Sequence, residues 1–196
     1  MISHLRGALL EKHPNVVVVD VHGVGYEVTI PVSVYSSLPA AGAEVALHIH
    51  THVREDALVL FGFVTTADKA LFEKLISVSG IGPKLAVTAL SGLASADLIA
   101  AIRNGAVDQL VKIPGVGKKT AERMVLELRD KLPAPEGGDQ APTAPSLSAL
   151  DEDVMSGLLN LGCARPAAEA AIRKARVSGV PDEFEALFRK ALELVR

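Results

Sequence analysis

The middle of the sequence contains a repeat that restricts the possible folds more than any other feature. Residues 77–86, SVSGIGPKLA, align with residues 112–121, KIPGVGKKTA, at an offset of 35 positions. Each segment has a Gly-apolar-Gly triplet, a Lys two residues after it, and an Ala two residues after the Lys. Apolar residues at helical spacing lie on both sides of each triplet. The repeat therefore predicts two consecutive helix-hairpin-helix units.

Each Gly-x-Gly hairpin is suited to bind a phosphate. Glycine adopts backbone angles closed to other residues and has no Cβ to keep a phosphate away. The next helix presents free N–H groups and the positive end of its dipole, while Ile81 and Val116 are expected to pack inward and pin the turns. Such a site holds a phosphate without reading a base. The residues predicted to form the DNA-binding surface are Gly80, Ile81, Gly82, Lys84, Gly115, Val116, Gly117, Lys118, Lys119, Thr120 and Arg123.

The alternative is that the triplets are only tight turns between helices, and the distribution of charge argues against it. The whole chain has a net charge of −3. Residues 64–132 hold ten Lys and Arg against seven Asp and Glu, a balance of +3, whereas residues 1–63 and 133–196 each have −3. Both hairpins lie in the only net-positive segment, which favours phosphate as the partner.

The apolar pattern predicts an α+β multidomain chain. Residues 1–63 contain short β-branched and alternating runs without a helical signal, which indicate an OB-like β-barrel. Residues 64–132 are expected to form an all-α double helix-hairpin-helix domain, and residues 133–146, rich in Pro, Gly and Ala, a flexible linker. Residues 147–196 predict a small domain of three helices.

Several other functions find little support. The GVGKKT run lacks the earlier Gly of a P-loop, where Lys112 stands instead, and neither repeat completes a dinucleotide fingerprint. The single Cys163 permits no internal disulfide and suits a reducing, cytoplasmic compartment. The sequence has neither the apolar leader of a secreted protein nor a run long enough to span a membrane.

Three histidines form a separate pattern. His48, His50 and His52 are expected to share one face of a strand, opposite a face of apolar residues. This spacing allows two metal ligands, but no further partner is evident. A surface facing solvent or DNA is therefore the preferred interpretation, and a metal site the alternative.

The motifs together resemble the RuvA family of Holliday junction branch-migration subunits over nearly the whole length. The matching runs are MI-x-x-L-R-G, GVGYEV, REDALVLFGF, SGIGPKLA, IPGVGKKTAERMVLEL and LNLG. The resemblance implies a mobile third domain and a non-catalytic protein that binds four-way junctions by structure, not sequence. It would hold them open and flat and recruit a motor for branch migration in recombination and repair. Cys163 stands where the family commonly has an aromatic residue, which puts the details of motor contact in doubt.

The resemblance also assigns roles and partners. It makes Glu55 and Asp56 an acidic pin, where the triplet Arg54–Asp56 alone would suggest a solvated hairpin tip. It places Leu158 and Leu161 in the contact with the motor, although core packing explains them equally well. The implied partners are junction DNA, the hexameric AAA+ ATPase RuvB, the resolvase RuvC, and further copies of the chain in a homotetramer or octamer. The chain itself would need no cofactor, because ATP and magnesium would bind to the motor.

Two other classes of function remain as alternatives. A nuclease or glycosylase would carry such hairpins, and a nuclease would add clustered carboxylates for a metal pair. Glu55 and Asp56 are the only tight acidic pair outside the C-terminal region. A general duplex-binding adaptor would also use the hairpins, although the acidic first domain argues against simple coating of a duplex.

Overall fold

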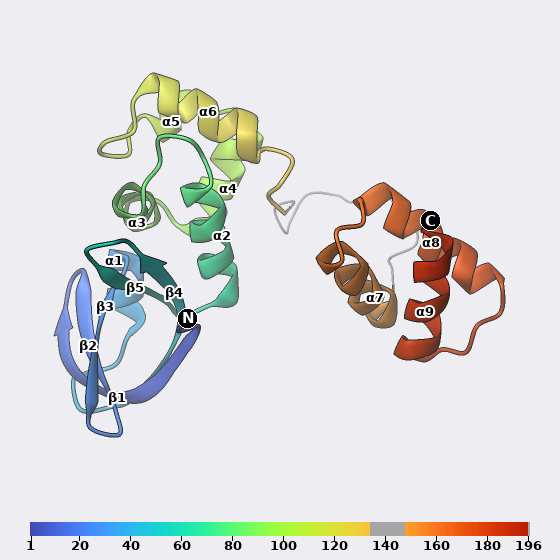
Figure 1. Ribbon diagram of the computed structural model, residues 1–196. Helices are drawn as coiled ribbons and strands as arrows, with labels where there is room; N and C mark the ends of the chain where they lie inside the picture. Colours follow the sequence, from blue (N-terminus) through green and yellow to red (C-terminus); the bar gives the residue numbers. More distant parts are fainter. Residues whose placement is uncertain (134–147, 196) are drawn as a thin grey trace. The chain divides into compact units, whose positions relative to one another are not determined.

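The computed structural model describes residues 1–133 and 148–195 and divides the chain into two compact units (Figure 1). The first unit is Met1–Gly138 and the second is Asp139–Arg196. Of the predicted linker, residues 134–146 lie outside the described residues. Each unit is described by itself below.

The first unit begins with a closed five-stranded barrel, which confirms the predicted OB-like fold. The strands close in the order β1-β2-β3-β5-β4, and only β3 and β5 pair in parallel. Closure requires a close approach at Gly62, where a Cβ would lie 2.6 Å from Cγ1 of Val28. The strands are β1 (His4–His13), β2 (Val16–Val21), β3 (Val24–Thr29), β4 (Glu44–Val53) and β5 (Leu58–Phe63).

One helix in this region was not predicted from the sequence. The short helix α1 (Val32–Ser37) follows Pro31 and connects β3 to β4. Its Val, Tyr and Ser residues have weak helix propensity, so the segment carries no helical signal. The helix forms because tertiary contacts hold it: the N–H of Val32 donates to Oγ of Ser91, and Oγ of Ser33 donates to the carbonyl of Leu90, both at 3.0 Å.

Five helices complete the first unit and confirm the all-α second segment. They share one apolar core, to which the barrel contributes Phe61 and Phe63 from β5. The first of them begins at Thr65, whose Oγ1 accepts a hydrogen bond from the N–H of Asp68 at 3.0 Å. The helices are α2 (Thr66–Ile76), α3 (Pro83–Gly92), α4 (Ser95–Arg103), α5 (Val107–Leu110) and α6 (Lys118–Leu128).

The described residues of the second unit, 148–195, form three helices, as the apolar pattern predicted. They are α7 (Ala149–Asn160), α8 (Arg165–Val177) and α9 (Phe184–Leu194). Leu158 is fully buried in their common core, whereas Leu161 is 61% exposed. A fully buried side chain cannot contact a partner while the core stays intact. The predicted partner contact of Leu158 is therefore wrong, and only Leu161 remains available for that role.

No single helix in the described ranges is long and apolar enough to cross a membrane, although the bent pair α3 and α4 together reaches that length and composition.

A charged network closes the second unit around Asp151. Nε of Arg176 donates to its carboxylate at 2.8 Å, and the backbone N–H of Ser148 donates to the other oxygen at 3.2 Å. Burial alone would raise the pKa of Asp151, but the hydrogen bonds from Arg176 and Ser148 and the charge of Arg176 outweigh burial. The pKa of Asp151 therefore lies below its ordinary value.

We predict that acid loosens this unit through Asp151. Because its pKa is lower in the folded state, the carboxylate contributes stability above the unfolded pKa of about 3.9, and this contribution is lost as pH falls through the folded pKa. Asp151→Asn should lower the amide protection factors of α7 and α8 a few-fold at neutral pH and flatten their loss on acidification. The control is Asp153→Asn, at an exposed position of the same helix. If the protection factors depended on pH in the same way in Asp151→Asn and Asp153→Asn, the prediction would be contradicted.

Candidate nucleic-acid interface

The two hairpins have the same backbone geometry. Gly80 and Gly115 lie in the left-handed region, with φ of 91° and 85°. Gly82 and Gly117 are extended, with φ of −86° and −83°, and each is the residue at which the next helix begins. Only the first glycine of each pair is therefore required by its backbone angles. A Cβ on Gly82 or Gly117 would meet no atom within 4 Å, so these glycines leave open space above the helix end.

The apolar residue of each triplet holds the turn. The N–H of Ile81 donates to the carbonyl of Val78, and the N–H of Val116 donates to that of Ile113, both at 3.0 Å. Both apolar side chains are 5% exposed, so they pack inward as predicted. With the N–H group engaged and the side chain buried, neither Ile81 nor Val116 has a donor or a surface for DNA. Their inclusion as direct contacts is corrected to a role in shaping the hairpin.

The first turns of α3 and α6 supply the free donors. The first intrahelical bonds run from Ala86 to Gly82 and from Ala121 to Gly117, each at 3.0 Å. Among the described hydrogen bonds, the N–H groups that precede these two alanines in the helix have no acceptor. Pro83 has no N–H, so the second hairpin offers one donor more than the first. The free donors belong to Gly82, Lys84 and Leu85 in the first hairpin and to Gly117, Lys118, Lys119 and Thr120 in the second.

The fold places the first hairpin against α6, the helix that follows the second hairpin. Nη1 of Arg123 on α6 donates to the carbonyl and to Oγ of Ser79, both at 3.2 Å. A groove of about 460 Å³ lies between the first hairpin and α6. Both turns lie on the same side of the helical bundle (Figure 1). The residues that line the groove are Ser79, Gly80, Lys119, Thr120, Glu122, Arg123 and Leu126.

Lys84 lies on another side of the first hairpin. It lines a hollow of about 380 Å³ together with Arg54 and Asp56 from the barrel, and with Gly82 and Pro83. The structure therefore separates the predicted residues into two groups. Lys119, Thr120 and Arg123 face the groove beside α6, whereas Lys84 faces the acidic tip of the barrel.

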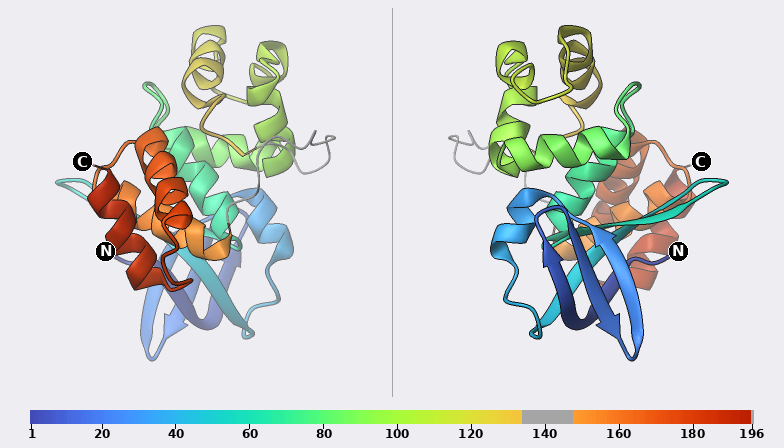
Figure 2. Two further views of the ribbon diagram at one scale, coloured as in Figure 1. Left: turned by 90° about the vertical axis from the view of Figure 1, so that its right-hand side faces the viewer. Right: turned by 90° about the vertical axis from the view of Figure 1, so that its left-hand side faces the viewer.

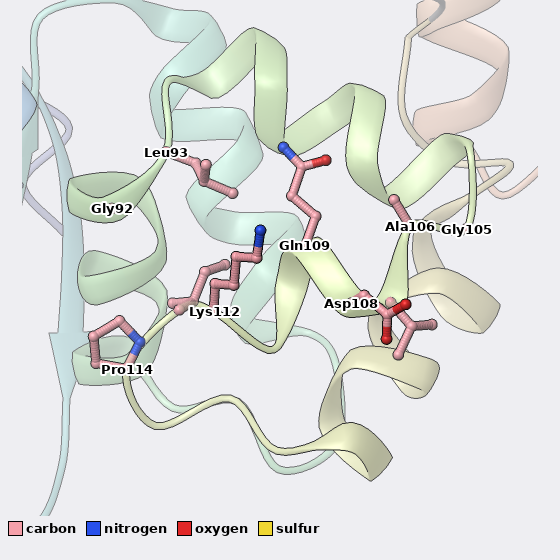
Figure 3. Close-up of a pocket in the computed structure, with 10 residues that line it drawn as sticks. Gly92, Leu93, Gly105, Ala106, Asp108, Gln109, Lys112 and Pro114 are labelled. Atoms are coloured by element: carbon pink, nitrogen blue, oxygen red, sulfur yellow. The ribbon is translucent and has the colours of Figure 1, made fainter.

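A hollow of about 670 Å³ beside the second hairpin is lined by Lys112, which was not among the predicted DNA-binding residues, and by Asp108. The side chains of Lys112 and Gln109 extend into it, toward Leu93 at the end of α3 (Figure 3). Lys112 stands immediately before the Ile-Pro-Gly of the second repeat, and this position could have identified it from the sequence as a residue near the hairpin. It adds a positive charge close to the predicted phosphate site.

The predicted acidic pin is the tip of the β4–β5 hairpin, which projects from the barrel (Figure 2). The N–H of Arg54 donates to the carbonyl of Ala57 at 2.8 Å and closes the turn around two exposed carboxylates, Glu55 and Asp56. Because Asp56 and Lys84 line one hollow, the tip lies beside the first hairpin.

The histidine face of β4 is covered by protein. His50 packs edge-on against Phe72 of α2 at 5.3 Å, and His52 against Phe61 at 6.3 Å. The His50 side chain is only 18% exposed, and its Nδ1 lies 3.1 Å from Oε1 of Glu73. The prediction of a face turned to solvent or DNA is therefore wrong for His50, whereas the half-buried His52 lines the hollow that Arg54, Asp56 and Lys84 share. Within the described residues, no three His, Cys, Asp or Glu side chains are grouped closely enough to hold a metal.

The two glycines of the second hairpin should respond differently to alanine. Gly115→Ala should lower the free energy of unfolding by about 1–2 kcal/mol, because its φ of 85° is left-handed and the new Cβ would lie 3.1 Å from Leu85. Gly117→Ala should leave stability unchanged but weaken DNA binding, because the Cβ would occupy the space above the free N–H groups. Urea unfolding, followed by circular dichroism, measures the free energy of unfolding. Fluorescence anisotropy with a labelled duplex measures DNA affinity. Undiminished DNA affinity in Gly117→Ala would remove the phosphate site from this hairpin.

Comparison with known proteins identifies both parts of the first unit. Residues 1–62 match the RuvA N terminal domain, and residues 72–130 match the SAM-like helix-hairpin-helix tandem. Three relatives carry the name Holliday junction branch migration complex subunit RuvA. They are 68% identical in Solibacter usitatus, 52% in Acidobacterium capsulatum and 47% in Syntrophobacter fumaroxidans, with all of this chain and all of each relative covered. The chain therefore belongs to the RuvA family of Holliday junction branch migration complex subunits.

Proposed function

We propose that this chain binds four-way DNA junctions by their shape, holds them open and flat, and recruits an ATPase motor for branch migration. One observation carries the proposal: two glycine hairpins with free helix N–H groups and a projecting acidic tip belong to one compact unit, and the tip lies beside the first hairpin. The hairpins supply affinity for any DNA backbone, and the tip supplies a reason to prefer a crossover.

The hairpins act through their free N–H groups and neighbouring lysines. A phosphate at a helix N-terminus gains charge-assisted hydrogen bonds and a favourable dipole without any contact to a base. Two such sites joined by the contact between Arg123 and Ser79 would hold two nearby phosphates in a fixed relation. Binding of this kind is independent of sequence and sensitive to salt.

The acidic tip acts by repulsion. Glu55 and Asp56 are exposed, and carboxylates close to phosphates raise the energy of a continuous duplex at that point. At a crossover, strands part and pair with new partners, so the tip would occupy the space that they leave. This role needs no nucleophile, acid–base pair or metal in the chain.

The partners follow from the same proposal. We propose a homotetramer or octamer that surrounds the crossover with its acidic tips, in the cytoplasm, where the lone Cys163 would remain reduced. The hexameric AAA+ ATPase RuvB would bind the second unit at a surface that includes the exposed Leu161, and the resolvase RuvC would share the junction. ATP and magnesium would belong to the motor.

The proposal is tested by fluorescence anisotropy with a labelled four-way junction, competed by linear duplex at fixed salt. We expect linear duplex to compete poorly. Glu55→Gln combined with Asp56→Asn should keep or increase junction affinity, because repulsion is removed, while 2-aminopurine at the crossover should report less strand opening. Equal competition by linear duplex would favour a general duplex-binding adaptor, and cleavage of the junction with magnesium would favour a nuclease.

Lys119 provides a separate test of the phosphate site. Lys119→Ala should weaken binding to all DNA sequences alike and lower the slope of log Kd against log salt by about one, because one ion pair with the backbone is lost. The control is Arg129→Ala, at an exposed position at the far end of the same helix. An unchanged slope for Lys119→Ala, or the same decrease for Arg129→Ala, would contradict a specific contact at the hairpin.

A further inference from the structure

The acidic tip belongs to the barrel and the hairpins belong to the helical segment. The distance between them therefore depends on the contacts between these two parts. Phe72 of α2 makes such contacts at the centre of an aromatic cluster, here called the Phe72 cluster: Phe61, Phe63, Phe72 and His50. Its ring lies 5.1 Å from that of Phe61 and 5.0 Å from that of Phe63, both on β5. Phe72 and Phe63 are fully buried. The strand that runs from the acidic tip is thus packed directly on the helix that leads to the first hairpin.

The Phe72 cluster alone would allow α2 to slide along the barrel, since apolar contacts are not directional. A polar contact at its edge adds direction. Nδ1 of His50 on β4 lies 3.1 Å from Oε1 of Glu73, the residue after Phe72. Nζ of Lys69, one turn earlier on α2, lies 3.9 Å from the same oxygen. The Glu73 carboxylate is therefore held by its own helix on one side and by the barrel on the other.

A second contact between the barrel and the helices lies near the C-terminus of α3. Ser33 and Val32 of α1 bind Leu90 and Ser91 of α3, the helix whose N-terminus forms the first hairpin. The helical segment is thus attached to the barrel at two places, on both sides of that hairpin in the sequence. Rotation about either contact is opposed by the other.

We propose that His50 and Glu73 are positioning residues that set the distance between the acidic tip and the hairpins, and so determine discrimination between a junction and a linear duplex. This inference rests on the proposed function. The tip can repel a continuous duplex only while it is held beside the hairpins, so duplex affinity depends on this distance. At a junction the strands turn away from the tip, so junction affinity depends on the distance less.

The first experiment compares junction and duplex affinity in variants of the full chain. His50→Ala should lower the ratio of junction to duplex affinity about tenfold, chiefly by tightening duplex binding, because the hydrogen bond that holds the tip where it repels a duplex is lost. His50→Asn should restore discrimination, because its amide N–H can donate in place of Nδ1. Lys69→Ala is the control, since it removes the ion pair to Glu73 within α2 and leaves the contact of His50 with Glu73 in place. An unchanged junction-to-duplex ratio in His50→Ala would overturn the proposal.

The second experiment needs no DNA and therefore separates this inference from the proposed function. Spin labels are placed at Ala57, beside the acidic tip, and at Arg129, at the end of α6, with Cys163→Ser to remove the native thiol. Double electron–electron resonance should give a narrow distance distribution in the parent chain and in Lys69→Ala, and a broader one in His50→Ala. Equal widths would reject His50 as a positioning residue even if the junction is bound selectively. A wild-type chain that fails to prefer a junction would instead reject the proposed function.

Discussion

The packing of Phe72 between the barrel and the helices is the contact on which the rest of the first unit depends. Phe61 and Phe63 come from a barrel strand, yet their side chains belong to the core of the helical segment. The neighbouring Leu60 points the other way, into the barrel core. One strand therefore serves two cores through its two faces. Without this shared strand, the acidic tip and the hairpins would be separate binding elements with no fixed relation.

Local sequence was sufficient for the hairpins because their geometry is set by adjacent residues. Gly80 and Gly115 take a left-handed φ, and Ile81 and Val116 close the turn to a carbonyl three residues earlier. Each of these features has a sequence signal within a few positions, and the repeat doubles it. The alternation with a period of two predicted β4, whereas β1 was not assigned from any run of its own.

The features that the sequence did not predict correctly all depend on distant contacts. Alternation along β4 separates His50 from Ile49 but does not reveal that α2 covers His50. Helix α1 is held by bonds to Leu90 and Ser91, more than fifty positions away. Leu158 and Leu161 stand in the same LLNLG run, and only the packing of three helices decides that the first is buried and the second exposed.

The net charge of −3 is compatible with DNA binding because screening makes charge a local property. At physiological salt the Debye length is about 8 Å, so a carboxylate affects the hairpins only when it lies close to them. Asp56 does lie close, because it lines the same hollow as Lys84. In the proposed function, attraction and repulsion would thus act within one small region, where Lys84 would favour a backbone that passes the first hairpin and Asp56 would disfavour one that continues across the tip. A strand that turns away at this point satisfies both, and strands turn away at a crossover.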